Sequence, residues 1–403
     1  MLRSFRHRGN STLIYGVGRI SALAGILPVD ATVFVLAGTH FYNSPSWGTL
    51  ERALSERGLG VLRETVSGEP SPEMVDGFTA IARDVGTSHV LSIGGGSTLD
   101  SGKAVAAMLH LEGSVADYLE GVGTRKPKGL TVPMIAVPTT AGTGSEATTN
   151  AVISRRSPGG FKKSLRHDAF IPPIALLDPE LALGCPLDIT QACAMDAFCQ
   201  LLESFLSIQA SPVTDMWARE GIILFAAGSR LFTENLIGSP EETGLRGELC
   251  LAAYSSGLAL SNAGLGTVHG IAGPIGAVCD VPHGVACGLL LPPVLRRVIR
   301  GLESMNDERS LRRLAWVGDV LHRSSLDTHS PPATPLESEF MFRSDDIDRL
   351  LNRLTQWADT LPPLLNYGMS EQDIDAVIAN ASNKNSPVAL DSGDWEEAIR
   401  EIL

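Results

Sequence analysis

Hydrophobic residues in the first part of the chain gather in short, nearly continuous runs, which are separated by segments with helical spacing. The runs are of strand length and lie at 32–36, 90–93, 134–137 and 174–177. Continuous apolar runs are typical of strands covered on both faces, as in a parallel sheet flanked by helices. From about Thr12 to Asp178 the pattern therefore predicts a doubly wound α/β domain with a mostly parallel sheet.

The pattern changes after Pro186, where apolar residues recur at helical spacing and strand-like runs nearly vanish. Helices are predicted over 189–207, 214–231, 243–262, 284–302, 311–321, 344–361 and 371–381, and a Pro- and Ser-containing surface loop over 323–338. A chain of 403 residues exceeds what one hydrophobic core usually holds. We therefore expect an α/β domain over 1–186 and an all-helical domain over 187–403.

A glycine-rich segment, Gly94–Lys103, follows the run 90–93 and leads into a helix-like stretch. Glycines between a strand and a helix let the backbone approach a diphosphate closely, and the first amides of the helix favour an anion. A plain tight turn would also account for the glycines. Ser97, Asp100 and Lys103 at fixed offsets favour a nucleotide site, because an ordinary turn does not require them.

Composition and charge narrow the class of protein. Hydrophobic residues make up 44% of the chain and charged residues 19%, which describes a well-packed globular protein. A formal net charge of −13 argues against nucleic acid or an anionic membrane as the main partner. Apolar stretches are much shorter than the roughly 20 residues of a spanning helix, and the basic N-terminus leads into no long apolar region. We therefore expect a cytoplasmic protein.

The cysteines are scattered along the chain without a C-x-x-C pair. There are six of them: Cys185, Cys193, Cys199, Cys250, Cys279 and Cys287. A chain of this size does not need disulfides for stability, so the spacing predicts reduced and mostly buried thiols. Disulfide pairing is the alternative.

Four polar residues in the second half are candidates for chemistry. Asp196 and Gln200 are four residues apart in a predicted helix and therefore project from one face. His269 and His283 are each followed by glycine in an apolar context. These residues predict a pocket that orients a substrate or holds a divalent metal. Two hydrogen-bonded structural histidines are the alternative.

Several motifs occur in an order that resembles the iron-containing (group III) alcohol dehydrogenases, over about residues 12–295. They are Gly94-Gly95-Gly96-Ser97 with Asp100 and Lys103, Pro138–Glu146, Asp178-Pro179-Glu180-Leu181, Met195-Asp196-Ala197, Val268-His269-Gly270 and Pro282-His283-Gly284. The resemblance implies a dehydroquinate synthase-like fold. In that fold a dinucleotide-binding α/β domain precedes a helical domain, with cofactor and metal in the cleft between them.

The resemblance also implies roles for individual residues. Residues matching the family's cofactor-binding motifs are Gly95, Gly96 and Ser97 at the pyrophosphate, Thr139, Thr140 and Thr143 at the phosphates and adjoining groups, Asp100, and Lys162 near the nicotinamide ribose. A solvated charged loop is the alternative for Lys162. Asp196, His269 and His283 match three of the family's four metal ligands.

Three positions depart from the family pattern. Gln200 stands where the family has its fourth metal-ligating histidine, and an amide oxygen is a weaker donor than imidazole for iron or zinc. Gly273 replaces a histidine that is a candidate proton relay. Gly38 replaces an aspartate that accepts the adenosine ribose hydroxyls, so NADP is permitted and favoured over NAD, with Thr39 and His40 as neighbours of the phosphate.

These features predict an NAD(P)-dependent alcohol dehydrogenase or aldehyde reductase acting on a small alcohol or carbonyl compound. The expected catalytic residues are His269, His283 and Gln200, acting with a divalent metal or directly as hydrogen-bond donors. Family resemblance implies a homodimer or larger assembly. The alternatives are a maleylacetate reductase-like or dehydroquinate synthase-like enzyme on the same scaffold, and a non-catalytic nucleotide-binding protein.

Overall fold

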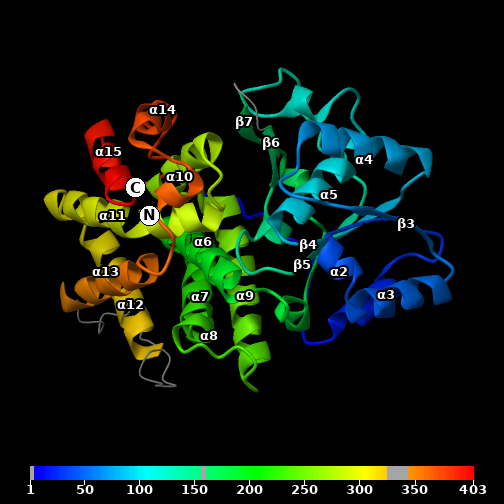
Figure 1. The fold of residues 1–403 in the computed structure, drawn as a ribbon, viewed down its shortest axis with the longest axis horizontal. Coiled ribbons are helices and arrows are strands. Elements are labelled where there is room, and N and C mark those ends of the chain that lie inside the picture. Colours follow the sequence, from blue (N-terminus) through cyan, green and yellow to red (C-terminus); the bar gives the residue numbers. More distant parts are fainter. Residues whose placement is uncertain (1–3, 156–159, 325–343) are drawn as a thin grey trace. The chain divides into compact units, whose positions relative to one another are not determined.

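The computed structural model describes residues 4–155, 160–324 and 344–403 (Figure 1). The chain divides into two compact units. One is Arg8–Cys185, and the other is Pro186–Leu403 together with the N-terminal segment up to His7. Most of the predicted loop 323–338 lies outside the described residues.

The first unit is built on a six-stranded parallel sheet with the order β1-β8-β5-β4-β2-β3. Its strands are β1 (Thr12–Tyr15), β2 (Thr32–Ala37), β3 (Gly60–Thr65), β4 (His89–Gly94), β5 (Met134–Pro138) and β8 (Ile174–Leu177). Its helices are α1 (Leu23–Ile26), α2 (Thr39–Tyr42), α3 (Pro45–Glu56), α4 (Pro72–Asp84) and α5 (Gly96–Met108).

Helices cover both faces of this sheet (Figure 1). Along β2, Phe34 and Leu36 pack into a core shared with α4 and α5, whereas Val33 and Val35 pack into a core shared with α1 and α3. The runs at 32–36, 90–93 and 134–137 each supply both cores, because successive strand residues point to opposite faces. The predicted doubly wound, mostly parallel α/β domain is confirmed.

A two-stranded antiparallel hairpin, β6 (Asn150–Arg155) and β7 (Phe161–Arg166), was not predicted. Only Ala151 and Ile153 of β6 and Leu165 of β7 belong to the buried core of the unit. Between Phe161, which packs against this core, and Leu165, β7 is polar, so it has no continuous apolar run that would be recognised as a strand. Lys162, for which a loop position was one interpretation, therefore lies on a strand.

The second unit is helical, and no strand occurs among its described residues. Its helices are α6 (Leu187–Leu206), α7 (Pro212–Gly228), α8 (Arg230–Thr233), α9 (Glu242–Ala263), α10 (Thr267–Val278), α11 (His283–Ser304), α12 (Glu308–Ser324), α13 (Ser344–Ala358), α14 (Ile374–Ile378) and α15 (Ser392–Arg400). Short 3₁₀ turns lie at Arg19–Ala22, Val115–Tyr118, Ser145–Ala147, Asp168–Phe170, Pro179–Ala182, Leu364–Tyr367 and Glu371–Asp373.

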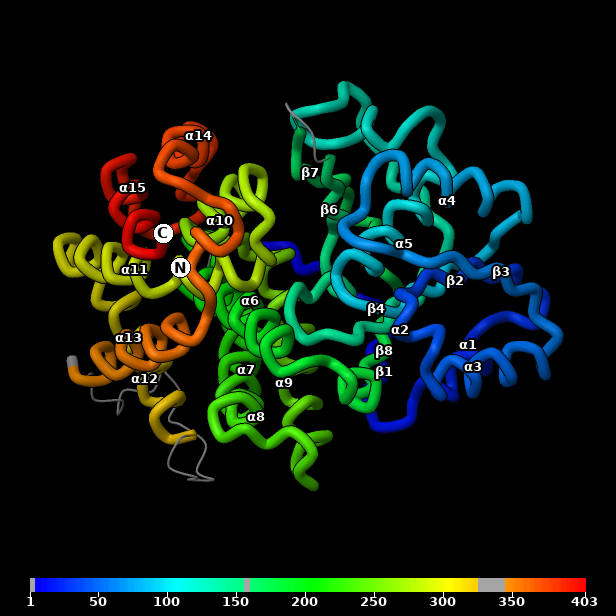
Figure 2. The backbone as a smooth tube through the Cα atoms, viewed as in Figure 1, coloured from blue at the N-terminus to red at the C-terminus, as the bar shows by residue number. Residues whose placement is uncertain are grey.

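Helix α6 is the centre of this unit. It is buried without interruption over 194–206, and it contacts α7, α9 and α11 (Figure 2). A helix that is buried on all sides must satisfy its polar side chains internally. The polar residues of α6 are therefore the first place to look for a site.

Two helices of this unit, α10 and α15, were not predicted, and the helix predicted over 371–381 is a 3₁₀ turn followed by the short α14. Residues 267–278 include Gly270, Gly273, Gly276 and Pro274, which have poor helix propensity. Packing against other elements overrides that propensity.

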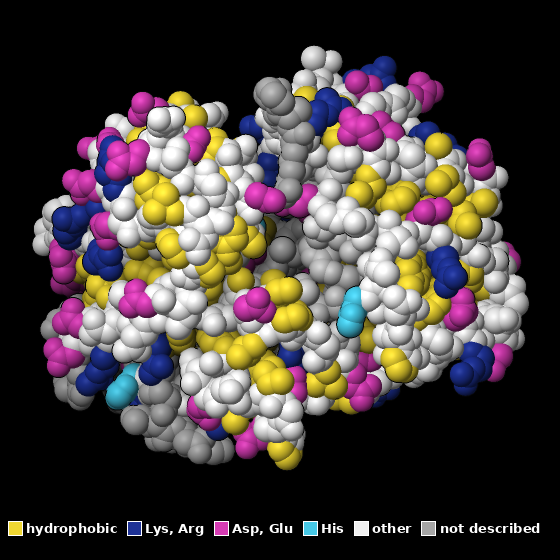
Figure 3. Space-filling model, in the orientation of Figure 1, with side chains coloured by type: hydrophobic (Ala, Val, Ile, Leu, Met, Phe, Trp, Pro, Cys, Tyr) yellow, Lys and Arg dark blue, Asp and Glu magenta, His cyan; other side chains and the backbone are white. Residues whose placement is uncertain are grey.

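The surface agrees with the acidic composition. On the face drawn in Figure 3, acidic and basic side chains are interspersed over the described residues and do not form a broad basic patch. None of the helices in the described parts of the chain has the length and apolar character needed to cross a membrane.

Candidate functional site

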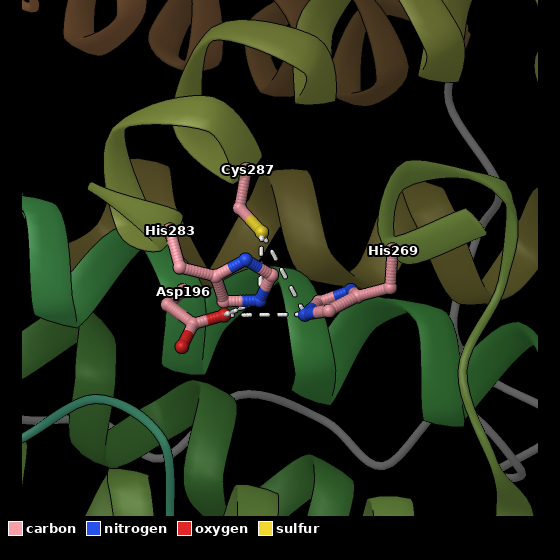
Figure 4. Close-up of side chains that lie close together, drawn as sticks. All are labelled: Asp196, His269, His283 and Cys287. Carbon is pink, nitrogen blue, oxygen red and sulfur yellow. Dashed lines mark hydrogen bonds and ion pairs between the residues drawn. The ribbon is translucent and has the colours of Figure 1, made fainter. Parts of the chain in front are cut away.

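Four side chains from three helices of the second unit converge on one point (Figure 4). Asp196 projects from α6, His269 from α10, and His283 and Cys287 from the first two turns of α11. One donor atom of each residue lies within 4.8 Å of the donor atoms of the others. The structure therefore brings Asp196, His269 and His283 together, and Cys287 joins them.

Within this cluster, Asp196 lies closer to His269 than to His283. Its Oδ1 lies 3.1 Å from Nε2 of His269 and 3.8 Å from Nε2 of His283. The Cys287 sulfur lies 3.7 Å from each of the same two nitrogens. Asp196, His269 and Cys287 are buried, whereas the side chain of His283 is 32% exposed, so the cluster opens on the His283 side.

A second carboxylate, Glu203 on α6, fixes the orientation of His269. Its Oε2 lies 2.7 Å from Nδ1 of His269, and its Oε1 accepts a 2.6 Å hydrogen bond from the amide of Val268. With Nδ1 directed at a carboxylate, Nε2 is the nitrogen that points into the cluster. Such a carboxylate partner is typical of metal-binding histidines.

The ionisable groups of the cluster shift one another's pKa values. Burial alone would lower the pKa of His269, but hydrogen bonds to Asp196 and Glu203 outweigh it and raise that pKa to about 9. Burial alone would raise the pKa of Asp196, but the nearby His283 and His269 hold it below its usual value. Burial raises the pKa of the Cys287 thiol well above its usual value.

These donors fit a divalent transition metal. Imidazole nitrogen, carboxylate oxygen and cysteine sulfur are ligands that zinc and related ions use in proteins. A buried carboxylate facing two imidazoles is also electrostatically suited to a cation. Among the described residues, this is the group of at least three His, Cys, Asp or Glu donors close enough to hold a metal.

Gln200 is buried one turn after Asp196, as its spacing predicted, but its amide is engaged elsewhere. Its Oε1 lies 2.7 Å from the hydroxyl of Ser256 on α9, which donates to it. A hydrogen bond from Gln200 also helps to lower the pKa of Asp196. The amide thus bridges Ser256 and Asp196 and holds the carboxylate in place.

The glycines after the two histidines have a steric role. A Cβ at Gly270 would lie 1.7 Å from the carbonyl oxygen of Ser382, and a Cβ at Gly284 would lie 2.1 Å from that of Ala192. Both glycines therefore allow backbone to pack closely beside a site histidine. Gly273, by contrast, has no atom within 4 Å of its Cβ position.

In the first unit, the predicted phosphate loop joins β4 to α5 as expected. Gly95 is the residue that precedes α5, and a Cβ there would lie 3.2 Å from Oγ1 of Thr140. A Cβ at Gly96 would lie 2.7 Å from Thr143.

The loop 139–144 after β5 thus packs on the glycine loop. The backbone amide of Thr139 donates a hydrogen bond to the carbonyl of Gly94. Ser97 follows in the first turn of α5.

Gly38 and Thr39 follow β2, whose carboxyl end lies beside that of β4. The connection from β2 leads outward to β3, whereas β4 lies on the other side of β2. The strand order therefore reverses between β2 and β4, and such a switch point is where open α/β sheets bind ligands. Gly38 and the glycine loop border this position.

Asp100 and Lys103 are tied to protein groups. Asp100 accepts hydrogen bonds from Ser145 Oγ at 2.5 Å and the Val152 amide at 2.8 Å, and pairs with the buried Lys103 at 3.0 Å. Lys103 also donates to the carbonyl of Ser145 and the hydroxyl of Thr148. These contacts anchor the segment 145–152 to α5. Contact of Asp100 with a cofactor stays a prediction.

Lys162, the last of the predicted cofactor residues, pairs with Glu69 and lies on β7. Contact between Lys162 and a nicotinamide ribose also stays a prediction.

Two site residues, Glu203 and Cys287, were not identified from sequence. Each follows a predicted site residue at helical spacing, Glu203 seven residues after Asp196 and Cys287 four residues after His283. The signal was therefore present, but the predicted helix began at residue 284 and left His283 outside it.

Two family models cover nearly all of the chain. Residues 10–179 match the model described as iron-containing alcohol dehydrogenase, and residues 190–402 match the C-terminal model of the same family. The chain is 37% identical over 227 residues to long-chain-alcohol dehydrogenase 1 of Geobacillus thermodenitrificans, a match that spans 56% of each chain. It is 30% identical over 328 residues to alcohol dehydrogenase 4 of Saccharomyces cerevisiae (strain YJM789), covering 80% of this chain and 81% of the yeast protein.

Solved structures share the whole fold. A 1,3-propanediol oxidoreductase aligns with a TM-score of 0.80 at 24% identity over 100% of both chains. A sulfoacetaldehyde reductase from Bifidobacterium kashiwanohense, in complex with NAD+, aligns with a TM-score of 0.76 at 24% identity over 100% of this chain and 99% of the other. At this identity the likeness shows the fold, which is dehydroquinate synthase-like. Together with the two family models, it shows that this chain belongs to the iron-containing alcohol dehydrogenase family.

Proposed function

We propose that this protein transfers a hydride between a nicotinamide cofactor and a small alcohol or aldehyde. The observation that carries the proposal is the convergence of Asp196, His269 and His283 in the helical unit. This cluster provides charged and hydrogen-bonding groups that can polarise a substrate oxygen. The names of the relatives, alcohol dehydrogenases and an aldehyde reductase, support the same class of reaction.

In this proposal Asp196, His269 and His283 hold a divalent metal, iron or zinc. Such a metal supplies Lewis-acid polarisation of a carbonyl or alcohol oxygen. Glu203 orients His269, and Gln200 orients Asp196. The exposed side of His283 is where a substrate would approach the cluster.

The cofactor pyrophosphate would be bound by the amides of Gly95, Gly96 and Ser97 at the N-terminus of α5, next to the threonines of the loop 139–144. A helix N-terminus is a favourable environment for phosphate. At Gly38 no carboxylate repels a 2′-phosphate, which supports NADP over NAD. Thr39 and His40 would be its neighbours.

The proton of the alcohol needs another route than in relatives with a histidine at the position of Gly273. Glycine has no side chain to carry a proton, and the space around its Cβ position is free of other atoms. We expect this proton to exchange with solvent on the side where His283 is exposed.

We also expect a homodimer or larger assembly and a cytoplasmic location. Native mass spectrometry would check the assembly, and cell fractionation would check the location.

The experiment that tests this function measures oxidation of NADPH and NADH with a panel of small aldehydes, alongside maleylacetate. Turnover with an aldehyde that falls at least about a thousandfold in His269→Ala would support the proposal. The control is His110→Ala, which removes an exposed histidine of the first unit. Turnover with maleylacetate alone would favour the alternative reductase, and cofactor binding without any turnover would favour a nucleotide-binding protein.

A further inference from the structure

Cys287 is the one member of the cluster to which no role has been given. It lies four residues after His283 on α11, so the two side chains project from the same face of the helix one turn apart (Figure 4). Its sulfur is fully buried and lies 3.7 Å from Nε2 of both His269 and His283. Both histidines thus direct the same type of nitrogen toward it.

The spacing of the four donor atoms matches that of ligands around one ion. Bonds of about 2.0 to 2.3 Å at tetrahedral angles place neighbouring donors about 3.3 to 3.6 Å apart. Four of these separations, from Asp196 Oδ1 to each Nε2 and from Cys287 Sγ to each Nε2, run from 3.1 to 3.8 Å, and the donor atoms of all four residues lie within 4.8 Å of one another. Small shifts of side chains would therefore bring all four atoms to bonding distance of a common centre.

Gln200, which occupies the family's fourth ligand position, is less well placed. Its amide bridges Ser256 and Asp196. To bind a metal through Oε1, it would have to share that oxygen between the metal and the hydroxyl of Ser256, or lose this hydrogen bond and leave Ser256 to donate to the carbonyl of Ala253. Cys287 has no such conflict, since its sulfur faces the donor atoms of the cluster.

We propose, resting on the metal site of the proposed function, that Cys287 replaces the family's missing histidine as the fourth protein ligand. The thiol releases its proton to solvent and binds as thiolate. A thiolate is a softer donor than an amide oxygen and favours zinc over metals that prefer hard ligands. Zinc can expand to five donors, so four protein ligands leave a position for substrate.

The test uses cobalt, which substitutes for zinc and reports thiolate ligation by an intense near-ultraviolet charge-transfer band. Full-length protein is exchanged with Co²⁺ and titrated, and the metal content of freshly purified protein is measured in parallel. The proposal predicts one equivalent of Co²⁺ with a charge-transfer band, and more zinc than iron in the purified protein. Cys287→Ser should lose the band and weaken Co²⁺ binding at least about tenfold.

Two further variants separate the ligands. Gln200→Ala removes the competing donor and should retain the band. Cys250→Ala removes another buried helical cysteine, on α9, and should leave both the band and the affinity as in the parent. Circular dichroism of each variant distinguishes loss of the ligand from loss of the fold.

The outcomes distinguish failure of the ligand assignment from failure of the metal site. A band that persists in folded Cys287→Ser, or loss of Co²⁺ binding in Gln200→Ala but not in Cys287→Ser, overturns the proposal. Stoichiometric Co²⁺ without a charge-transfer band also overturns it, but leaves the metal site of the proposed function intact. A parent protein that binds no Co²⁺ overturns both the ligand assignment and the metal site.

Discussion

At the scale of single residues, the site consists of the side chains that the helices direct into the cluster. Asp196, Gln200 and Glu203 lie along one face of the buried α6, and each has a different task. Asp196 faces the two histidines, Gln200 holds Asp196, and Glu203 holds His269. The site therefore depends on positioning residues as much as on candidate ligands.

The role of Glu203 can be measured by its effect on metal affinity. Glu203→Gln removes the charge beside Nδ1 of His269 while keeping the size of the side chain. We expect metal affinity to fall about 10- to 100-fold, as measured by competition with a chelator. Glu248→Gln, on α9, is the control and should change little. Equal affinity in Glu203→Gln and the parent would mean that Glu203 does not orient a ligand.

In the proposed function, the preference for NADP over NAD depends on Gly38. No atom lies within 4 Å of its Cβ position and its φ of −78° suits any residue, so an aspartate fits there without strain. Gly38→Asp should repel a 2′-phosphate and lower the ratio of kcat/KM for NADPH to that for NADH by about tenfold, which corresponds to about 1.4 kcal/mol. Gly48→Asp, an exposed position on α3 that is equally free of neighbours, is the control. An unchanged ratio would show that position 38 does not contact the ribose.

At the scale of elements, α10 shows why part of the site could not be predicted from sequence. His269 and His283 were predicted as site residues. The helix that carries His269 was not predicted, because the glycines and the proline around this residue have poor helix propensity. Gly270 is required because the carbonyl of Ser382, more than a hundred residues later in the chain, packs against it. A local pattern does not contain such a long-range contact. Four of the six parallel strands (β2, β4, β5 and β8), by contrast, follow directly from continuous apolar runs, whereas β1 and β3 have no such run.

Two glycines of α10 form a matched pair for testing this packing. Gly270→Ala would place its Cβ 1.7 Å from the carbonyl oxygen of Ser382, so we expect a loss of about 1–3 kcal/mol in stability and weaker metal retention. Gly273→Ala has free space and should stabilise the protein by up to about 1 kcal/mol. Chemical denaturation checks both. A Gly270→Ala variant as stable as Gly273→Ala would contradict the packing that we describe.

Glu146, in the segment after β5, should make the stability of the protein depend on pH. Burial, only partly offset by Lys103, raises the pKa of Glu146 to about 7 from its ordinary value of 4.5. Between these values the folded protein binds more protons at Glu146 than the unfolded chain does, so this group lowers stability as pH rises. At pH 8, Glu146→Gln should therefore raise the free energy of unfolding by on the order of 3 kcal/mol relative to the parent. At pH 4.5 the substitution should change the free energy of unfolding little.

Thermal unfolding of the parent and of Glu146→Gln across this pH range checks the prediction. Glu112→Gln, an exposed position, is the control. If the difference in stability between the parent and Glu146→Gln were the same at both ends of the range, Glu146 would have an ordinary pKa. Asp100 and Lys103 face Glu146 and are unchanged in all three proteins.

At the scale of the whole molecule, the proposed function requires an acidic protein to bind an anionic cofactor. With a net charge of −13, attraction must come from local groups and not from the overall field. The N-terminus of α5, at the point where the strand order reverses, provides such a local environment. Family membership and fold agree with the proposed oxidoreductase, whose proposed metal ligand set differs from the family pattern at Gln200.

The measurement that tests this account most directly follows metal content and aldehyde reduction in the same sample through chelation and reconstitution. We expect about one divalent metal per chain, loss of NAD(P)H-dependent turnover in proportion to the metal removed, and return of turnover when zinc or iron is restored. Asp196→Asn should retain the fold and bind metal weakly. Full turnover in protein shown to contain no metal would contradict the account.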